Sequence, residues 1–199
     1  MPPPLILASG SSARATLLRG ARIAFSVAPP QVDEDAAKAL ALTQGRTPPQ
    51  VAMLLAQAKS LAVSAAQSGA LVIGADQVLE IDGALLSKAP DLASARAQLT
   101  ALAGRTHSLL SAVCVARDGA IVWRHLGEAR MTMRRLAEGE VERYVQAAGE
   151  AILSSVGAYH FEGLGAHLFD AVEGDQATIV GLPLLPLLGF LRTQGISFS

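Results

Sequence analysis

The stretch from Ala70 to Ile81 constrains the fold of this chain more than any other. It opens on the continuous apolar run Leu71-Val72-Ile73, without the alternation of a strand that has one face in water. Such runs are typical of strands covered on both faces, as in sheets with helices packed on each side. We therefore expect a buried strand here, inside an α/β sheet.

The beginning of the chain has the pattern strand, small-residue loop, helix. Leu5 to Ala8 predicts a short buried strand, Ser9 to Ser12 the loop, and Ala13 to Arg19 the helix. Free N–H groups and the dipole at a helix N-terminus favour a bound anion. Arg14 lies in the first turn, where a cation is disfavoured unless an anion is near. Two interpretations stay open: a serine-capped helix with a solvated arginine, or an anion site.

The remaining pattern mixes helices and strands, with hairpin signals at Asp82-Gly83 and Asp118-Gly119. This predicts a single α/β domain over residues 1–199 with a mixed, twisted sheet. The expected helices are Gln50–Ser68, Leu92–Leu102, Ala137–Ala148 and Pro183–Leu191. The other expected strands are Ile23–Val27, Ser108–Ala116, Ile121–Met133, Leu168–Val172 and Thr178–Val180.

Composition excludes several classes of protein. Hydrophobic residues make up 51% of the chain and charged residues 17%, the opposite of a disordered chain. With 16 basic and 17 acidic residues, no global field attracts nucleic acid or an anionic membrane, although a local cationic pocket is still allowed. The single cysteine, Cys114, excludes an intrachain disulfide, and we expect a buried thiol.

We expect a cytoplasmic protein. A signal peptide begins with a positively charged region, but no basic residue precedes Arg14 in this chain. The apolar stretch from Val180 to Leu191 is too short to span a bilayer and contains Pro183 and Pro186.

Three charged positions stand out because of their apolar or junctional surroundings. Asp76 follows the buried run directly, and a buried acid needs a salt-bridge partner, a metal or a catalytic role. Lys59 is the only charge in its predicted helix, where it either snorkels to solvent or points into a pocket. Glu34 belongs to the run Asp33-Glu34-Asp35, which is either a solvated helix start or a source of metal ligands.

No common motif identifies the chemistry of this chain, but its charged residues suit the binding of a nucleotide. The chain lacks both common phosphate-binding fingerprints, the zinc-protease motif and the serine nucleophile elbow. Cations suit phosphates, whereas carboxylates suit Mg²⁺-type metals and a water that must lose a proton. Metal-assisted hydrolysis of a phosphoanhydride is therefore coherent, although composition alone does not single it out.

An ordered set of motifs resembles the Maf (septum-formation) family of nucleotide pyrophosphatases over nearly the whole chain. The set is Leu5-Ile6-Leu7-Ala8-Ser9-Gly10-Ser11 with Arg14 and Leu17-Leu18, Val32-Asp33-Glu34, Leu55-Ala56-Gln57-Ala58-Lys59, Gly74-Ala75-Asp76-Gln77, Asp82-Gly83, Lys88, Gly104-Arg105-Thr106-His107, Gly157-Ala158-Tyr159, Glu162-Gly163, Glu173-Gly174-Asp175 and Val180-Gly181-Leu182-Pro183.

The resemblance implies an elongated mixed α/β fold, with flanking helices and two lobes around a central cleft, similar to inosine-triphosphate pyrophosphatases. It implies hydrolysis of nucleoside triphosphates between the α- and β-phosphates with Mg²⁺ or Mn²⁺, nucleotide-pool house-cleaning, a link to cell-division arrest, and a possible homodimer. Asp76 would be the general base. Glu34 and Asp76 would hold the metal, and the phosphate-binding residues would be Ser9, Arg14, Lys59 and Lys88.

The resemblance also implies that three positions separate subfamilies with different nucleotide substrates. In this chain they are Ala13, Gln77 and Glu162. Members that cleave dTTP and UTP carry Arg, Thr and Gln there, and those that cleave 7-methyl-GTP carry Gln and Glu at the last two. This chain resembles the second group at Gln77 and Glu162. The stretch Gly157-Ala158-Tyr159 resembles the first group, so the subfamily stays open.

The chain departs from the family pattern in two places. Ser12-Ala13 replaces the usual Pro-Arg, and Ala89 separates Lys88 from Pro90. The departure at Ala13 puts the identity of the substrate in question, because that position is linked to base choice. The rival functions are a nucleotide-binding regulator of septum formation and a phosphohydrolase that releases single phosphates.

Overall fold

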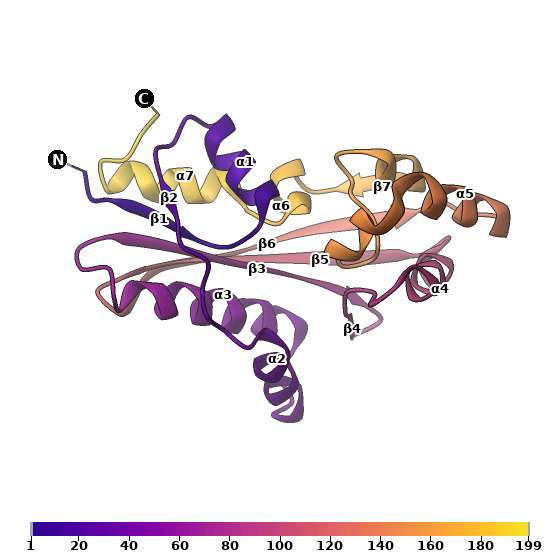
Figure 1. The fold of residues 1–199 in the computed structure, drawn as a ribbon, viewed down its shortest axis with the longest axis horizontal. Helices are drawn as coiled ribbons and strands as arrows, with labels where there is room; N and C mark the ends of the chain where they lie inside the picture. The colour runs from indigo at the N-terminus through magenta and orange to yellow at the C-terminus, as the bar shows by residue number, and fades with distance from the viewer. Residues whose placement is uncertain (1, 199) are drawn as a thin grey trace. The chain divides into compact units, whose positions relative to one another are not determined.

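The protein, described over residues 2–198 of a computed structural model, is built on one open seven-stranded sheet (Figure 1). The strand order is β2-β1-β3-β5-β6-β7, and β4 pairs with β3. The strands are β1 (Leu5–Ala8), β2 (Ser26–Val27), β3 (Leu71–Ile81), β4 (Ala84–Leu86), β5 (Thr106–Arg117), β6 (Ala120–Met133) and β7 (Phe169–Glu173). Parallel and antiparallel pairs occur together, so the predicted mixed α/β sheet is confirmed.

Besides the strands, residues 2–198 form seven α-helices and two short 3-10 helices. The helices are α1 (Ser12–Gly20), α2 (Glu34–Thr43), α3 (Pro48–Ser64), α4 (Leu92–Leu102), α5 (Glu138–Ala148), α6 (Gln176–Val180) and α7 (Leu184–Thr193), with η1 (Gly149–Ser154) and η2 (Leu164–Leu168). Within residues 2–198, none of them combines the length and the apolar character that crossing a bilayer requires.

The chain divides into two compact units. Unit 1 comprises Met1–Gln77, Ser111–Gly127 and Gly181–Ser199, and unit 2 comprises Val78–Leu110 and Glu128–Val180. The prediction of a single domain over residues 1–199 stays a prediction.

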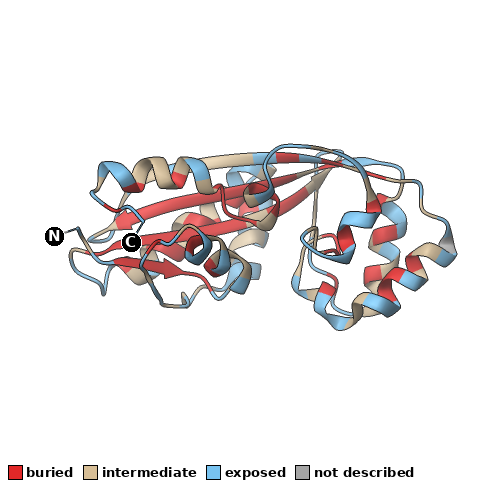
Figure 2. Cartoon of the chain, turned by 90° about the horizontal axis from the view of Figure 1, so that it is seen from above, coloured by how far each residue is buried: buried red, intermediate tan, exposed pale blue. Residues whose placement is uncertain are grey.

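In unit 1, helices cover both faces of the sheet, because side chains alternate along each strand. β1 runs parallel to β3, with Leu5 beside Leu71 and Ala8 beside Gly74. One face packs on α1 and α7, and the other face packs on α3 (Figure 1). The residues from Leu71 to Asp76 are all buried. Figure 2 shows long red, that is buried, stretches along the strands of the sheet. The predicted strand covered on both faces is confirmed.

Unit 2 has its own core, formed by α4, α5 and the strand segments that belong to this unit. Leu99 and Leu102 of α4 pack in one cluster with Val145 of α5 and with Met131 and Met133 of β6. Asp91 caps α4, because its carboxylate accepts a hydrogen bond from the amide of Ser94 at 2.7 Å. The predicted helix Leu92–Leu102 is confirmed.

The structure corrects the expected strand at Thr178–Val180. These β-branched residues belong to the short helix α6. Asp175 accepts hydrogen bonds from the amide of Thr178 at 2.9 Å and from its hydroxyl at 2.6 Å, which starts a helical turn. Local side-chain bonding thus outweighs β propensity in a segment this short.

Candidate active site

The candidate site in unit 1 forms where β1 ends and its neighbour β3 continues. β1 stops at Ala8, opposite Gly74, so the carbonyl of Ala75 has no further β1 residue beside it. The loop from Ser9 then leads into α1, where Ser11 caps the helix by accepting from the amide of Arg14 at 3.4 Å. In open α/β sheets, ligands bind at such carboxyl ends of strands.

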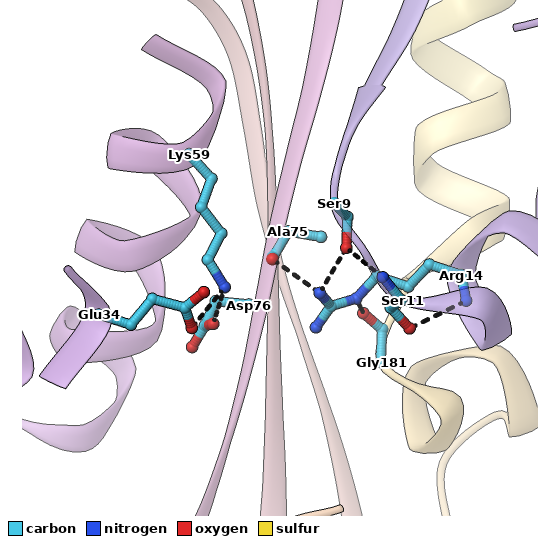
Figure 3. Close-up of polar contacts among 8 residues, drawn as sticks. All are labelled: Ser9, Ser11, Arg14, Glu34, Lys59, Ala75, Asp76 and Gly181. Carbon is cyan, nitrogen blue, oxygen red and sulfur yellow. Dashed lines mark hydrogen bonds and ion pairs between the residues drawn. The ribbon is translucent and has the colours of Figure 1, made fainter. Parts of the chain in front are cut away.

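Arg14 ties this loop to two distant parts of the chain (Figure 3). Its Nε donates to the carbonyl of Gly181 at 2.9 Å, and its Nη1 donates to the carbonyl of Ala75 at 3.0 Å and to Ser9 Oγ at 3.2 Å. The interpretation of Arg14 as a solvated side chain is therefore wrong. Burial lowers the pKa of Arg14, while the carboxylates of Asp76 and Glu34 raise it.

Helix α3 packs unusually close to the opposite face of β3. A Cβ atom on Gly74 would overlap the carbonyl oxygen of Ala56 and lie 2.5 Å from the amide nitrogen of Ser60. Only glycine lets strand and helix approach this closely. The close approach places Lys59 of α3 beside Asp76, two residues further along the strand.

Lys59 bridges two carboxylates (Figure 3). Its Nζ lies 2.7 Å from Asp76 Oδ1 and 2.8 Å from Glu34 Oε2. The side chains of Lys59 and Asp76 are only 7% and 8% exposed, whereas that of Glu34 is 51% exposed. Lys59 therefore does not snorkel to solvent, and Glu34, the first residue of α2, is more than a solvated helix start.

The pKa of Asp76 is raised, because burial penalises its charged form. The ammonium of Lys59, through its charge and its hydrogen bond, and then the charge of Arg14 act in the opposite direction, and Glu34 adds to the rise. A carboxylate made more basic in this way, yet held in place by Lys59, is suited to accept a proton from water.

Glu34 and Asp76 are the two carboxylates of this site that a divalent metal could use. Residues 2–198 contain no group of three or more His, Cys, Asp or Glu side chains placed to hold a metal ion. Glu34 and Asp76 meet at a single cation, so both can face one ion. Mg²⁺ is commonly bound by one or two carboxylates together with substrate phosphates and water. The residues therefore fit a metal that arrives with a phosphate substrate.

Gln77 points away from Asp76, as neighbouring strand residues must. Its Nε2 donates to Ser111 Oγ at 2.9 Å, and Ser111 precedes Val113 and Val115, which pack on the α1–α7 side. Neither Ser111 nor the carbonyl of Gly181 was expected at the site. A lone hydroxyl in the apolar strand Leu109 to Ala116 was the available signal for Ser111, whereas a backbone carbonyl leaves none.

The structure brings together Ser9 with Arg14, and Glu34 with Lys59 and Asp76. Ala13 is half-buried on α1, next to Arg14. Lys88 and Glu162 belong to unit 2, and both are exposed there. Their predicted roles in phosphate binding and base choice stay predictions.

Known proteins share much of this sequence. The family model described as Maf-like protein matches residues 4–194, so this chain belongs to the Maf family. It is 52% identical over 190 residues to a protein of Paramagnetospirillum magneticum named nucleoside triphosphate pyrophosphatase, covering 96% of this chain and 98% of that one. A protein of Brucella abortus named 7-methyl-GTP pyrophosphatase is 49% identical, with 96% of each chain covered. One of Caulobacter vibrioides, named nucleoside triphosphate pyrophosphatase, is 50% identical, again with 96% of each chain covered.

Proposed function

We propose that this protein hydrolyses the α–β phosphoanhydride of nucleoside triphosphates, releasing a monophosphate and pyrophosphate. The observation that carries the proposal is the buried Lys59, held between Asp76 and Glu34 at the end of a sheet where Arg14 also lies. The names of the relatives at about half identity support the same reaction.

In the proposed reaction, Asp76 accepts the proton of a water molecule while the water oxygen attacks the α-phosphorus. A P–O bond forms there, the bond from the α-phosphorus to the bridging oxygen breaks, and pyrophosphate leaves with the bonding electron pair. Lys59 keeps Asp76 Oδ1 fixed through the 2.7 Å contact, so the carboxylate needs little reorientation. Arg14, held by carbonyls and Ser9, places positive charge where the phosphates would bind. Lys88 is proposed as a further phosphate ligand.

Glu34 and Asp76 would hold a divalent cation, Mg²⁺ or Mn²⁺. Such an ion, when bound, neutralises phosphate charge and polarises the phosphoryl oxygen. Lys59 already shares both carboxylates, so it limits the negative charge that they present to a triphosphate.

For the nucleobase, we propose that Gln77 and Glu162 select the substrate, with 7-methyl-GTP favoured over dTTP and UTP. A carboxylate at Glu162 could accept from the N1–H and the exocyclic amine of guanine. Relatives named for 7-methyl-GTP and for nucleoside triphosphates in general lie at nearly the same identity, so this choice rests on the two residues. Nucleotide-pool house-cleaning and the link to cell-division arrest stay predictions.

Product analysis tests the reaction. The purified protein is incubated with 7-methyl-GTP, GTP, dTTP and UTP in the presence of Mg²⁺ or Mn²⁺, and pyrophosphate and orthophosphate are measured separately. Pyrophosphate is expected. Orthophosphate alone would indicate a phosphatase, and neither product would indicate a binding protein.

Asp76→Asn tests the assignment of the base. The amide keeps the shape of the side chain and removes its basicity, so turnover is expected to fall at least about 100-fold. Asp170→Asn, at an exposed position of β7, is the matched control and should keep wild-type turnover. Turnover of Asp76→Asn within a few-fold of wild type would exclude Asp76 as the base.

A further inference from the structure

Ser111 is a fully buried hydroxyl in an apolar strand. Its side chain is 0% exposed, and it lies in the continuously buried part of β5 that ends at Ala116. A buried hydroxyl costs free energy unless it is hydrogen-bonded, so an apolar residue would suit this position better on packing grounds alone. Its Oγ accepts a hydrogen bond from Gln77 Nε2 at 2.9 Å, and both residues belong to unit 1.

Gln77 is placed next to the group proposed to meet the phosphates. A Cβ atom added to Gly181 would lie 3.4 Å from Arg14 Nη2 and 3.8 Å from Gln77 Cβ. Gly181 has a φ of +104°, which favours glycine, and the space that its side chain would fill borders both Arg14 and Gln77. A ligand that reaches Arg14 therefore comes close to Gln77.

The amide of Gln77 is chemically two-ended. One end donates two hydrogen bonds and the other end accepts, so its orientation decides which pattern a nucleobase meets. The terminal torsion of a glutamine is broad and does not fix that orientation by itself. In this structure Gln77 presents its amide nitrogen to the Ser111 hydroxyl at 2.9 Å, and because that hydroxyl is held inside a buried strand, the contact favours one orientation of the amide.

We propose that Ser111 is a positioning residue for nucleotide selection, whose hydroxyl holds the amide of Gln77 in the orientation that reads the base. The proposal rests on the proposed function and adds to it a residue without contact to the substrate. The hydroxyl acts through Gln77, so its removal should change the preference among nucleotides while pyrophosphate remains the product.

The test compares kcat/KM for 7-methyl-GTP and UTP in the wild type, Ser111→Ala and Ser111→Thr. The ratio of the two values should shift by about two- to tenfold in Ser111→Ala, as the loss of one neutral hydrogen bond allows. Ser111→Thr keeps the hydroxyl and should restore the ratio. Ser64→Ala removes another buried hydroxyl, one that accepts from the amide of Gly119, and should leave the ratio unchanged.

A double-mutant cycle separates positioning from a general packing effect. In a Gln77→Ala background, Ser111→Ala should cause no further shift of the ratio, because the group that it orients is gone. An equal shift in both backgrounds, or an unchanged ratio in Ser111→Ala, would overturn the proposal. Should Ser111→Ala fail to fold, Ser111→Cys, of similar shape and with a weaker acceptor, gives the same comparison.

The two proposals fail separately. If the wild type releases pyrophosphate and the ratio does not respond to Ser111, only the positioning role is lost. If the wild type releases no pyrophosphate from any nucleotide, the proposed function falls and the inference falls with it.

Discussion

One residue, Lys59, controls the charge of the candidate site. It places one positive charge between two carboxylates, within 2.8 Å of both. A buried ion pair of this kind is a poor source of stability, because desolvation offsets much of the attraction. It does control protonation, since an adjacent cation favours the charged form of Asp76.

Lys59→Met should therefore shift the pH dependence of activity. In the proposed reaction Asp76 must be ionised to accept a proton, so kcat/KM should rise with pH through the pKa of this carboxyl group. Without the ammonium, burial and Glu34 would raise that pKa further, and the acid limb of the profile should move to higher pH. The profile of kcat/KM against pH is measured for wild type and variant, with Lys38→Met as the control for loss of a lysine charge. An acid limb that stays in place would contradict the coupling.

Single residues also show where the sequence was informative. Asp76 was identifiable because an acid beside the buried run Leu71-Val72-Ile73 needs an explanation. The partners of Arg14 were not identifiable, since two of them are carbonyls and one of those, Gly181, lies 167 positions away. A carbonyl exists at every position, so no residue type marks the one that is used.

Among the contacts between helices and strands, that of β3 with α3 matters most for the candidate site, because it places Lys59 beside Asp76. Helix and strand were both predicted, and α3 begins at Pro48, where Thr47 donates its amide to Gln50 Oε1 at 3.0 Å. Their approach distance was not predictable, because Gly74 suits a bend or a bulge as well as a close contact. The run Asp33-Glu34-Asp35 suggested a helix start, and Asp33 does cap α2, but the extent of that helix was not predicted.

Gly74→Ala should separate α3 from β3. The added methyl group meets the backbone of Ala56 and Ser60, which cannot move independently of the helix. Overpacking of this kind typically costs about 1–3 kcal/mol, and the displacement should also loosen the contact of Lys59 with Asp76 and lower kcat/KM. Gly20→Ala, at the end of α1 where nothing lies within 4 Å, is the matched control. Melting temperature and kcat/KM are measured for both, and a wild-type result for Gly74→Ala would refute the tight contact.

The net charge of the whole molecule is near zero, but the two units carry charges of opposite sign. Unit 1 carries nine basic and five acidic residues, whereas unit 2 carries seven basic and twelve acidic residues. The balance of −1 over the chain excludes a global basic field, but it also averages over the positive unit that holds Arg14 and Lys59. The sequence could not reveal this, because each unit is assembled from separate stretches of chain.

The stability of the molecule to acid should depend on His107. This histidine is 2% exposed, its Nε2 lies 2.7 Å from the hydroxyl of Tyr159, and its buried Nδ1 has no hydrogen-bond partner among the described residues. Burial lowers the pKa of His107 to about 4. The unfolded chain takes up this proton near pH 6.5, so the folded state loses stability as pH falls from there towards 4.

The size of that loss is testable against a second histidine. The shift allows up to about 3 kcal/mol between pH 6.5 and 4, because each unit of pKa difference is worth about 1.4 kcal/mol. His107→Gln cannot titrate in this range, so its melting temperature should fall less steeply with decreasing pH than that of the wild type, even if it is lower at pH 7.5. His167→Gln, at an exposed position, should keep the wild-type slope. Equal slopes for His107→Gln and the wild type would show that the acid sensitivity of the fold arises from the carboxyl groups alone.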